Sequence, residues 1–147
     1  MEKVSFDSSS VHSYLTIIQS VISRMAANSS SCKTWCITLV SAIVVIISKN
    51  DDPNYVWIAI IPILLFFFLD TYYLSLERQF REVYNSFIRK LHHGEATVED
   101  VFYITPKTGL SNTFFQFIKA TGSISIWPFY TLLIVMLFVI HKWVLES

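Results

Sequence analysis

The stretch from Tyr55 to His92 constrains the fold most, because its two halves differ sharply in charge. Residues 55–69 carry no charge, whereas residues 70–90 mix charged and apolar side chains at helical spacing. A continuous helix of this length would measure roughly 57 Å, against about 30 Å for the hydrocarbon core of a bilayer. The pattern therefore predicts a helix that starts in a membrane and ends in water.

Composition favours an integral membrane protein. The chain of 147 residues is 53% hydrophobic and 15% charged, which is more apolar than one soluble domain of this size requires. The 11 basic and 11 acidic residues cancel, so the basic surface typical of a nucleic-acid binder is not expected. Residues 1–10 lack the pattern of a cleaved secretory signal, and we expect the N-terminus to be retained.

The first third of the chain predicts an amphipathic helix, residues 11–33, that runs into a first membrane span, residues 34–49. Apolar residues recur every three or four positions from Val11 to Met25. Residues 28–31 are small and polar but include no Gly or Pro, so we expect the helix to continue through them. Cys32 and Cys36 lie on one helix face and predict neither a disulfide nor a zinc site.

Residues 49–54 predict a tight polar turn, because Pro53 prevents a helix from continuing. The second span, residues 55–72, then runs antiparallel to the first, and the chain continues as a charged helix over residues 73–92. We expect a bend near Pro62, which removes one backbone hydrogen bond inside the span.

The charged helix carries an apolar stripe close to a coiled-coil repeat. Its spacings of three and four leave two interpretations open: packing on the same chain, or packing between subunits. Exposed ion pairs are expected between Glu77 and Arg81 and between Arg78 and Glu82. The stripe consists of Leu69, Tyr73, Leu76, Phe80, Val83, Phe87 and Leu91.

Residues 94–121 predict a connector between the second and third spans. Gly94 should end the preceding helix, and Thr97 with Asp100 resembles a capping box. Residues 101–104 fit a short helix or a strand equally well, residues 105–109 a turn, and residues 111–120 a short helix. A third span is expected over residues 124–143, with Pro128 in its first turn and Trp127 and Trp143 at its ends.

Basic residues favour a cytoplasmic N-terminus and connector, with the turn and the C-terminus outside. The turn has Lys49 alone, and the remaining Lys and Arg residues outside the C-terminal tail are Lys3, Arg24, Lys33, Arg78, Arg81, Arg89, Lys90, Lys107 and Lys119. Asp70 is then expected near the inner boundary of the hydrocarbon. There it needs either water or an ion-pair partner, for which Arg24 and Lys33 are the candidates.

No pattern of catalytic, cofactor-binding or metal-ligating residues stands out. The three glycines, Gly94, Gly109 and Gly122, are too scattered for a phosphate-binding loop. His92 and His93 are adjacent, so their side chains diverge by about 100° on a helix and would not easily share a metal ion. We therefore expect a protein that is not an enzyme and that uses no cofactor.

Three segments carry a family resemblance: residues 22–29, 33–42 and 69–78. They resemble the small bacterial SLATT-type membrane effectors of nucleotide-signalling and anti-phage systems, over roughly residues 14–90. The resemblance implies a homo-oligomeric protein of the bacterial inner membrane that permeabilises it after a danger signal. A cytosolic sensor, a signalling enzyme or its nucleotide product would be a partner, besides the lipid membrane itself.

Two other functions remain open at this point. A non-catalytic membrane anchor would recruit a cytosolic protein through the connector, and a small transporter would carry an ion or solute. The transporter is the least supported of the three, because Asp70 is the only charge in the expected spans apart from Lys49 and Lys142 at the ends of theirs, and no repeat is evident.

Overall fold

The computed structural model describes residues 4–5, 8–47, 53–102, 104 and 110–146. Within these ranges the regular structure is entirely helical, and the predicted all-α class is confirmed. The elements are α1 (Ser9–Ile47), the 3-10 helix η1 (Pro53–Ala59), α2 (Ile60–His92), α3 (Val98–Val101), α4 (Leu110–Thr121) and α5 (Trp127–Glu146).

Helix α1 is continuous over 39 residues. Ser8 begins it, since its hydroxyl oxygen accepts a hydrogen bond from the N–H of Val11 at 3.2 Å. The small polar residues 28–31 stay helical, because nothing in them breaks the hydrogen-bond ladder. At about 1.5 Å per residue, the helix is roughly 58 Å long.

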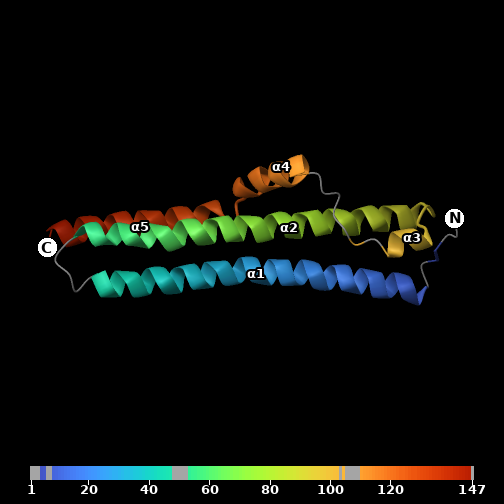
Figure 1. Ribbon diagram of the computed structural model, residues 1–147, viewed down its shortest axis with the longest axis horizontal. Coiled ribbons are helices and arrows are strands. Elements are labelled where there is room, and N and C mark those ends of the chain that lie inside the picture. Colours follow the sequence, from blue (N-terminus) through green and yellow to red (C-terminus); the bar gives the residue numbers. More distant parts are fainter. Residues whose placement is uncertain (1–3, 6–7, 48–52, 103, 105–109, 147) are drawn as a thin grey trace.

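Helices α1 and α2 lie side by side and run in opposite directions (Figure 1). Tyr14, near the start of α1, contacts Phe87, near the end of α2, with ring centroids 4.6 Å apart. Further along, Ser29 contacts Asp70. The two helices are thus paired along most of their length.

The start of the second span differs from the expectation of one α-helix with a bend near Pro62. Residues 53–59 form the 3-10 helix η1, and the α-helix begins only at Ile60. If Ile58 were α-helical, the ring of Pro62 would collide with its carbonyl group. With the start at Ile60, Pro62 falls in the first turn, where N–H groups have no intrahelical acceptor, and no bend in the interior is required.

The ends of α2 and α3 follow local signals. Gly94 has a φ of 66°, and the N–H groups of Gly94 and Glu95 donate to the carbonyls of Leu91 and Lys90. This is the Schellman arrangement that glycine favours. The short helix α3 covers residues 98–101 and so includes only Val101 of the segment 101–104; Phe102 lies in a turn, Ile104 has no regular structure, and residue 103 lies outside the described residues. The carboxylate of Asp100 accepts a hydrogen bond from the N–H of Thr97 at 3.0 Å, as expected for a capping box.

The last two helices pack against α2 (Figure 1). Helix α4 covers part of the middle of α2, and α5 runs beside its first half toward the end where α1 meets η1. Helix α5 starts at Trp127, three residues later than the expected third span, with Pro128 in its first turn. The predicted turn at residues 105–109 lies outside the described residues, as do residues 49–52 of the predicted hairpin turn.

Two apolar clusters lie at opposite ends of the hairpin. The turn-side cluster joins α1, η1, α2 and α5 through residues such as Val40, Ile63 and Leu137. The far-end cluster joins α1, α2 and the α3 region through residues such as Ile18, Phe87 and Val101. The buried residues between the two clusters are mostly polar.

Candidate functional site

Asp70 is the centre of the buried polar region. Its side chain is fully buried, and three polar side chains from two other helices surround it. Lys33 of α1 forms an ion pair with it, Nζ to Oδ2 at 2.6 Å. Ser29 of α1 donates its hydroxyl to Oδ1, and Tyr130 of α5 donates its hydroxyl to Oδ2 at 3.3 Å. We refer to these four residues as the Asp70 cluster.

The helical repeat of α1 explains its contribution. Ser29 and Lys33 are four residues apart and therefore lie on one face, with Lys33 Nζ 3.5 Å from Ser29 Oγ. The free thiols of Cys32 and Cys36 occupy the same face and are also buried. Arg24 was the other candidate partner of Asp70. It is exposed and lies nine residues before Lys33, two and a half turns along the helix, so it is not the partner.

Because the Asp70 carboxylate is buried, the free energy of the fold depends strongly on its partners. An unpaired carboxylate would be costly to bury, whereas this one meets a cation and two hydroxyl donors. Among the described residues, every buried side-chain nitrogen or oxygen has a hydrogen-bond partner. A buried pair of this kind adds little net stability, but removing one partner is expensive. The cluster therefore links α1, α2 and α5 through one buried carboxylate.

The polar region continues along α2 beyond Asp70. Thr71, Ser75 and Gln79 follow at four-residue spacing and are all buried. Thr71 donates its hydroxyl to the carbonyl of Phe67 at 2.7 Å, and the Gln79 amide donates to Ser75 Oγ at 3.2 Å. This stripe was not predicted, because the periodicity considered for this helix was that of its apolar residues. The regular spacing of small polar residues was the available signal.

The predicted apolar stripe does not form one continuous buried surface. Phe87 and Leu91 are buried in the far-end cluster, and Val83 packs against it. Leu69 is 38% exposed, and Tyr73, Leu76 and Phe80 are half-buried. A repeat of 3.5 residues drifts by about 20° per heptad on a straight helix, so the stripe turns away from α1. Its last part meets its own chain.

Arg78 holds the junction between α4 and α5. Its guanidinium donates to the carbonyl of Lys119 at 3.2 Å and to Ser123 Oγ at 2.8 Å. The expected pair between Arg78 and Glu82 is therefore replaced, and Glu82 instead accepts a hydrogen bond from Gln116 of α4. The other expected pair, Glu77 with Arg81, is present at 2.8 Å.

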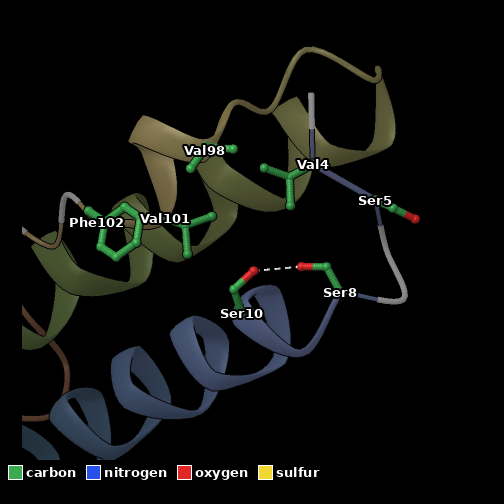
Figure 2. A pocket seen from close by; sticks show the side chains of 7 residues that line it. All are labelled: Val4, Ser5, Ser8, Ser10, Val98, Val101 and Phe102. Carbon is green, nitrogen blue, oxygen red and sulfur yellow. Dashed lines mark hydrogen bonds between the residues drawn. The ribbon is translucent and has the colours of Figure 1, made fainter. Parts of the chain in front are cut away.

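A small pocket of about 240 Å³ lies at the far end of the hairpin (Figure 2). Valine and phenylalanine side chains form one part of its wall and serine hydroxyls the other, and Ser8 and Ser10 are hydrogen-bonded at 2.7 Å. Its lining residues are Val4, Ser5, Ser8, Ser10, Val98, Val101 and Phe102.

Two ionisable groups near this pocket have shifted pKa values. The hydrogen bond from Lys90, 2.6 Å from Asp100, lowers the pKa of that carboxyl, and the bonds from Thr97 act in the same direction. Burial raises the pKa of Tyr14, and the negative charge of Asp100 raises it further. Neither group is part of the Asp70 cluster.

Comparisons with protein-family models, with curated proteins and with solved structures give no match to this chain. Within the described ranges, no three His, Cys, Asp or Glu side chains lie together in a way that could hold a metal ion.

Proposed function

We propose that this chain is a multi-pass membrane protein whose turn-side half lies in the bilayer. The observation that supports this most is the distribution of exposed apolar side chains. Most of the large ones lie on α1 after Lys33, on η1 and α2 before Tyr73, and on α5. Examples are Val45, Leu65 and Val135, each more than half exposed. A water-soluble monomer rarely presents so extended an apolar surface.

The helix lengths agree with this arrangement. Helix α1 and the continuous helical segment Tyr55–His92, which combines part of η1 with α2, are long and apolar enough to cross a membrane, and both exceed its thickness. The apolar part of α5, Trp127–Trp143, is shorter, and the Trp at each end suits the membrane interface. On the counts of Lys and Arg, the N-terminus faces the cytoplasm of a bacterial cell and the C-terminus faces outward.

We further propose that the protein acts as a homo-oligomeric effector that permeabilises the inner membrane, as its resemblance to defence effectors implies. The Asp70 cluster supports this role, because it places a carboxylate and an ammonium at the level where the exposed apolar surface ends. Intramembrane charges of this kind commonly mark pathways for ions or water. Several subunits could assemble a water-filled path beside these charges.

A dye-release assay tests this function. Purified protein is reconstituted into anionic liposomes that contain a self-quenched fluorophore, and release is followed against protein-to-lipid ratio. We expect release to rise more steeply than linearly, because several subunits must assemble. Release no greater than from liposomes carrying an unrelated three-span protein would contradict permeabilisation.

One observation favours an anchor or scaffold instead. Helix α4 exposes Phe115 at 65% and Ile118 at 51%, outside the apolar surface assigned to lipid. These residues are three apart and therefore share a face that a cytosolic protein could cover. Purification of the protein from its native membrane distinguishes the two functions. A stoichiometric cytosolic partner lost in Phe115→Ser would support the anchor, and a homo-oligomer without such a partner would count against it.

A further inference from the structure

Helix α5 closes one side of the Asp70 cluster. Tyr130 is 3% exposed, its hydroxyl bonds to Asp70, and its ring lies against Phe67 with centroids 5.3 Å apart. The other contacts of Asp70 come from α1, through Ser29 and Lys33. Ser29 and Lys33 of α1 therefore hold the Asp70 carboxylate on one side, and Tyr130 of α5 holds it on the other.

Helix α5 is less deeply integrated into the fold than α1 and α2 are. Its inner face packs in the turn-side cluster through Tyr130, Leu133 and Leu137, and Ile126, directly before the helix, belongs to the same cluster. Its outer face, including Leu132, Val135 and Val139, is exposed along the helix. Lipid tails are as apolar as these side chains. Packing of α5 against the other helices, instead of against lipid, is therefore stabilised little by the hydrophobic effect.

Displacement of α5 would open one side of the turn-side cluster but would leave the contacts between α1 and α2 at Asp70 and at the far end in place. The ion pair of Lys33 with Asp70, the bond from Ser29 and the entire far-end cluster involve α1, α2 and the α3 region. The displaced state would, however, uncover a charged pair next to lipid. Such a pair must then be covered by another subunit or by water.

We propose that α5 is an autoinhibitory cover. In the resting subunit Tyr130 shields the Asp70–Lys33 pair, and in the active state α5 moves aside so that the pair faces a water path between subunits. This inference rests on the proposed permeabilising function and adds the step that controls it. Tyr130 acts as a positioning residue, because it holds the cover in place and conducts nothing itself.

A substitution and a native thiol test the movement without reference to conductance. Cys36 is fully buried in the same cluster as Tyr130. In a Cys32→Ala background we expect Tyr130→Phe to raise the rate at which a membrane-permeant maleimide labels Cys36 by about tenfold, as the loss of one hydrogen bond to a charged group predicts. Tyr72→Phe, a change at an exposed tyrosine of α2, is the matched control and should leave the rate unchanged.

A reversible cross-link tests whether the movement controls permeability. The rings of Trp57 and Phe138 are 5.1 Å apart, so cysteines at these positions, with Cys32 and Cys36 replaced by Ala, suit a short reducible bifunctional thiol reagent. We expect the cross-link to abolish dye release and a reductant to restore it. The unlinked double variant shows whether the two substitutions themselves disturb the protein.

The outcomes separate the two proposals. Unchanged Cys36 labelling in Tyr130→Phe, or dye release that persists with the cross-link in place, would overturn the cover and leave permeabilisation standing. Faster labelling with no dye release from any variant would support the movement of α5 and contradict the permeabilising function.

Discussion

At the scale of single residues, the ion pair between Asp70 and Lys33 is where one substitution should lower the free energy of unfolding most. Lys33→Met would keep most of the side-chain volume and remove the charge that pairs with the fully buried carboxylate. Breaking a buried pair from one side costs about 3–5 kcal/mol. We expect this loss in the free energy of unfolding, measured by denaturant titration in detergent micelles.

The double variant Lys33→Met/Asp70→Leu is the informative comparison. It removes both charges together, so we expect it to recover most of the lost stability. Lys119→Met, at an exposed lysine, is the matched control and should change the free energy of unfolding by less than about 0.5 kcal/mol. If Lys33→Met costs no more than this control, the buried pair does not have the role assigned to it.

Asp100 should make the far end of the hairpin sensitive to acid. Its folded pKa lies below the ordinary value of 3.8, chiefly because Lys90 donates a hydrogen bond to the carboxylate. A lowered pKa stabilises the fold above the unfolded value, and this contribution is lost as pH falls through the folded value. The protection factors of residues 97–101 against hydrogen exchange, which are corrected for the intrinsic pH dependence of exchange, should therefore fall below about pH 4. In Asp100→Asn these protection factors should be lower already at neutral pH and should lack that step.

Asp70 and its candidate partner Lys33 were predicted from the sequence, whereas Ser29 and Tyr130 were not. Asp70 and Lys33 stand out because charges are rare in apolar segments. Ser29 and Tyr130 are separated from Asp70 by 41 and 60 positions, and neither is unusual in its own helix. Which faces of α1, α2 and α5 meet depends on packing along whole helices, which no local pattern specifies.

At the scale of elements, the helix ends were the most predictable features. Gly94, the Thr97–Asp100 pair and Pro128 each act through neighbouring backbone groups, so their effects can be read locally. The 3-10 start of the second span was not predicted, since the collision caused by Pro62 acts four residues upstream. The residues of the apolar stripe lie on one helix, as predicted. That the stripe turns away from α1 over part of its length was not predicted.

Because the stripe turns away from α1, substitutions of two of its residues, Phe87 and Phe80, should have different effects. Phe87 is buried against Tyr14, so Phe87→Ala should lower the free energy of unfolding by about 3–5 kcal/mol. Phe80 is only half-buried. We expect Phe80→Glu to reduce the oligomer size on a detergent column while the subunit stays folded, as judged by circular dichroism.

Ile17→Glu is the control for that experiment. Ile17 is nearly half exposed in the same part of the molecule but lies on α1, outside the stripe. It should leave the oligomer unchanged. An unaltered elution volume for Phe80→Glu would show that the half-buried part of the stripe meets its own chain rather than another subunit.

At the scale of the whole molecule, two opposite requirements explain the elongated shape. The exposed apolar surface at the turn side suits lipid, whereas the far end, with exposed groups such as Arg81 and Lys90, suits water. Helices longer than a bilayer is thick would satisfy both without a separate domain. The division of the hairpin into an apolar half and a charged half was predictable from charge placement, while the position of α5 beside α2 was not.

If the turn-side half lies in lipid and the far end in water, fluorophores attached to the two parts should be quenched by different reagents. A fluorophore on Val135→Cys, on the outer face of α5, should be quenched by spin-labelled lipid tails and protected from aqueous iodide. The same fluorophore on Ile17→Cys should behave in the opposite way, because Ile17 lies beyond the apolar surface. Both variants carry Cys32→Ala and Cys36→Ala, so that only the introduced thiol reacts. Equal iodide quenching at the two sites would contradict a membrane location for the turn-side half, because a water-soluble hairpin would expose both positions alike.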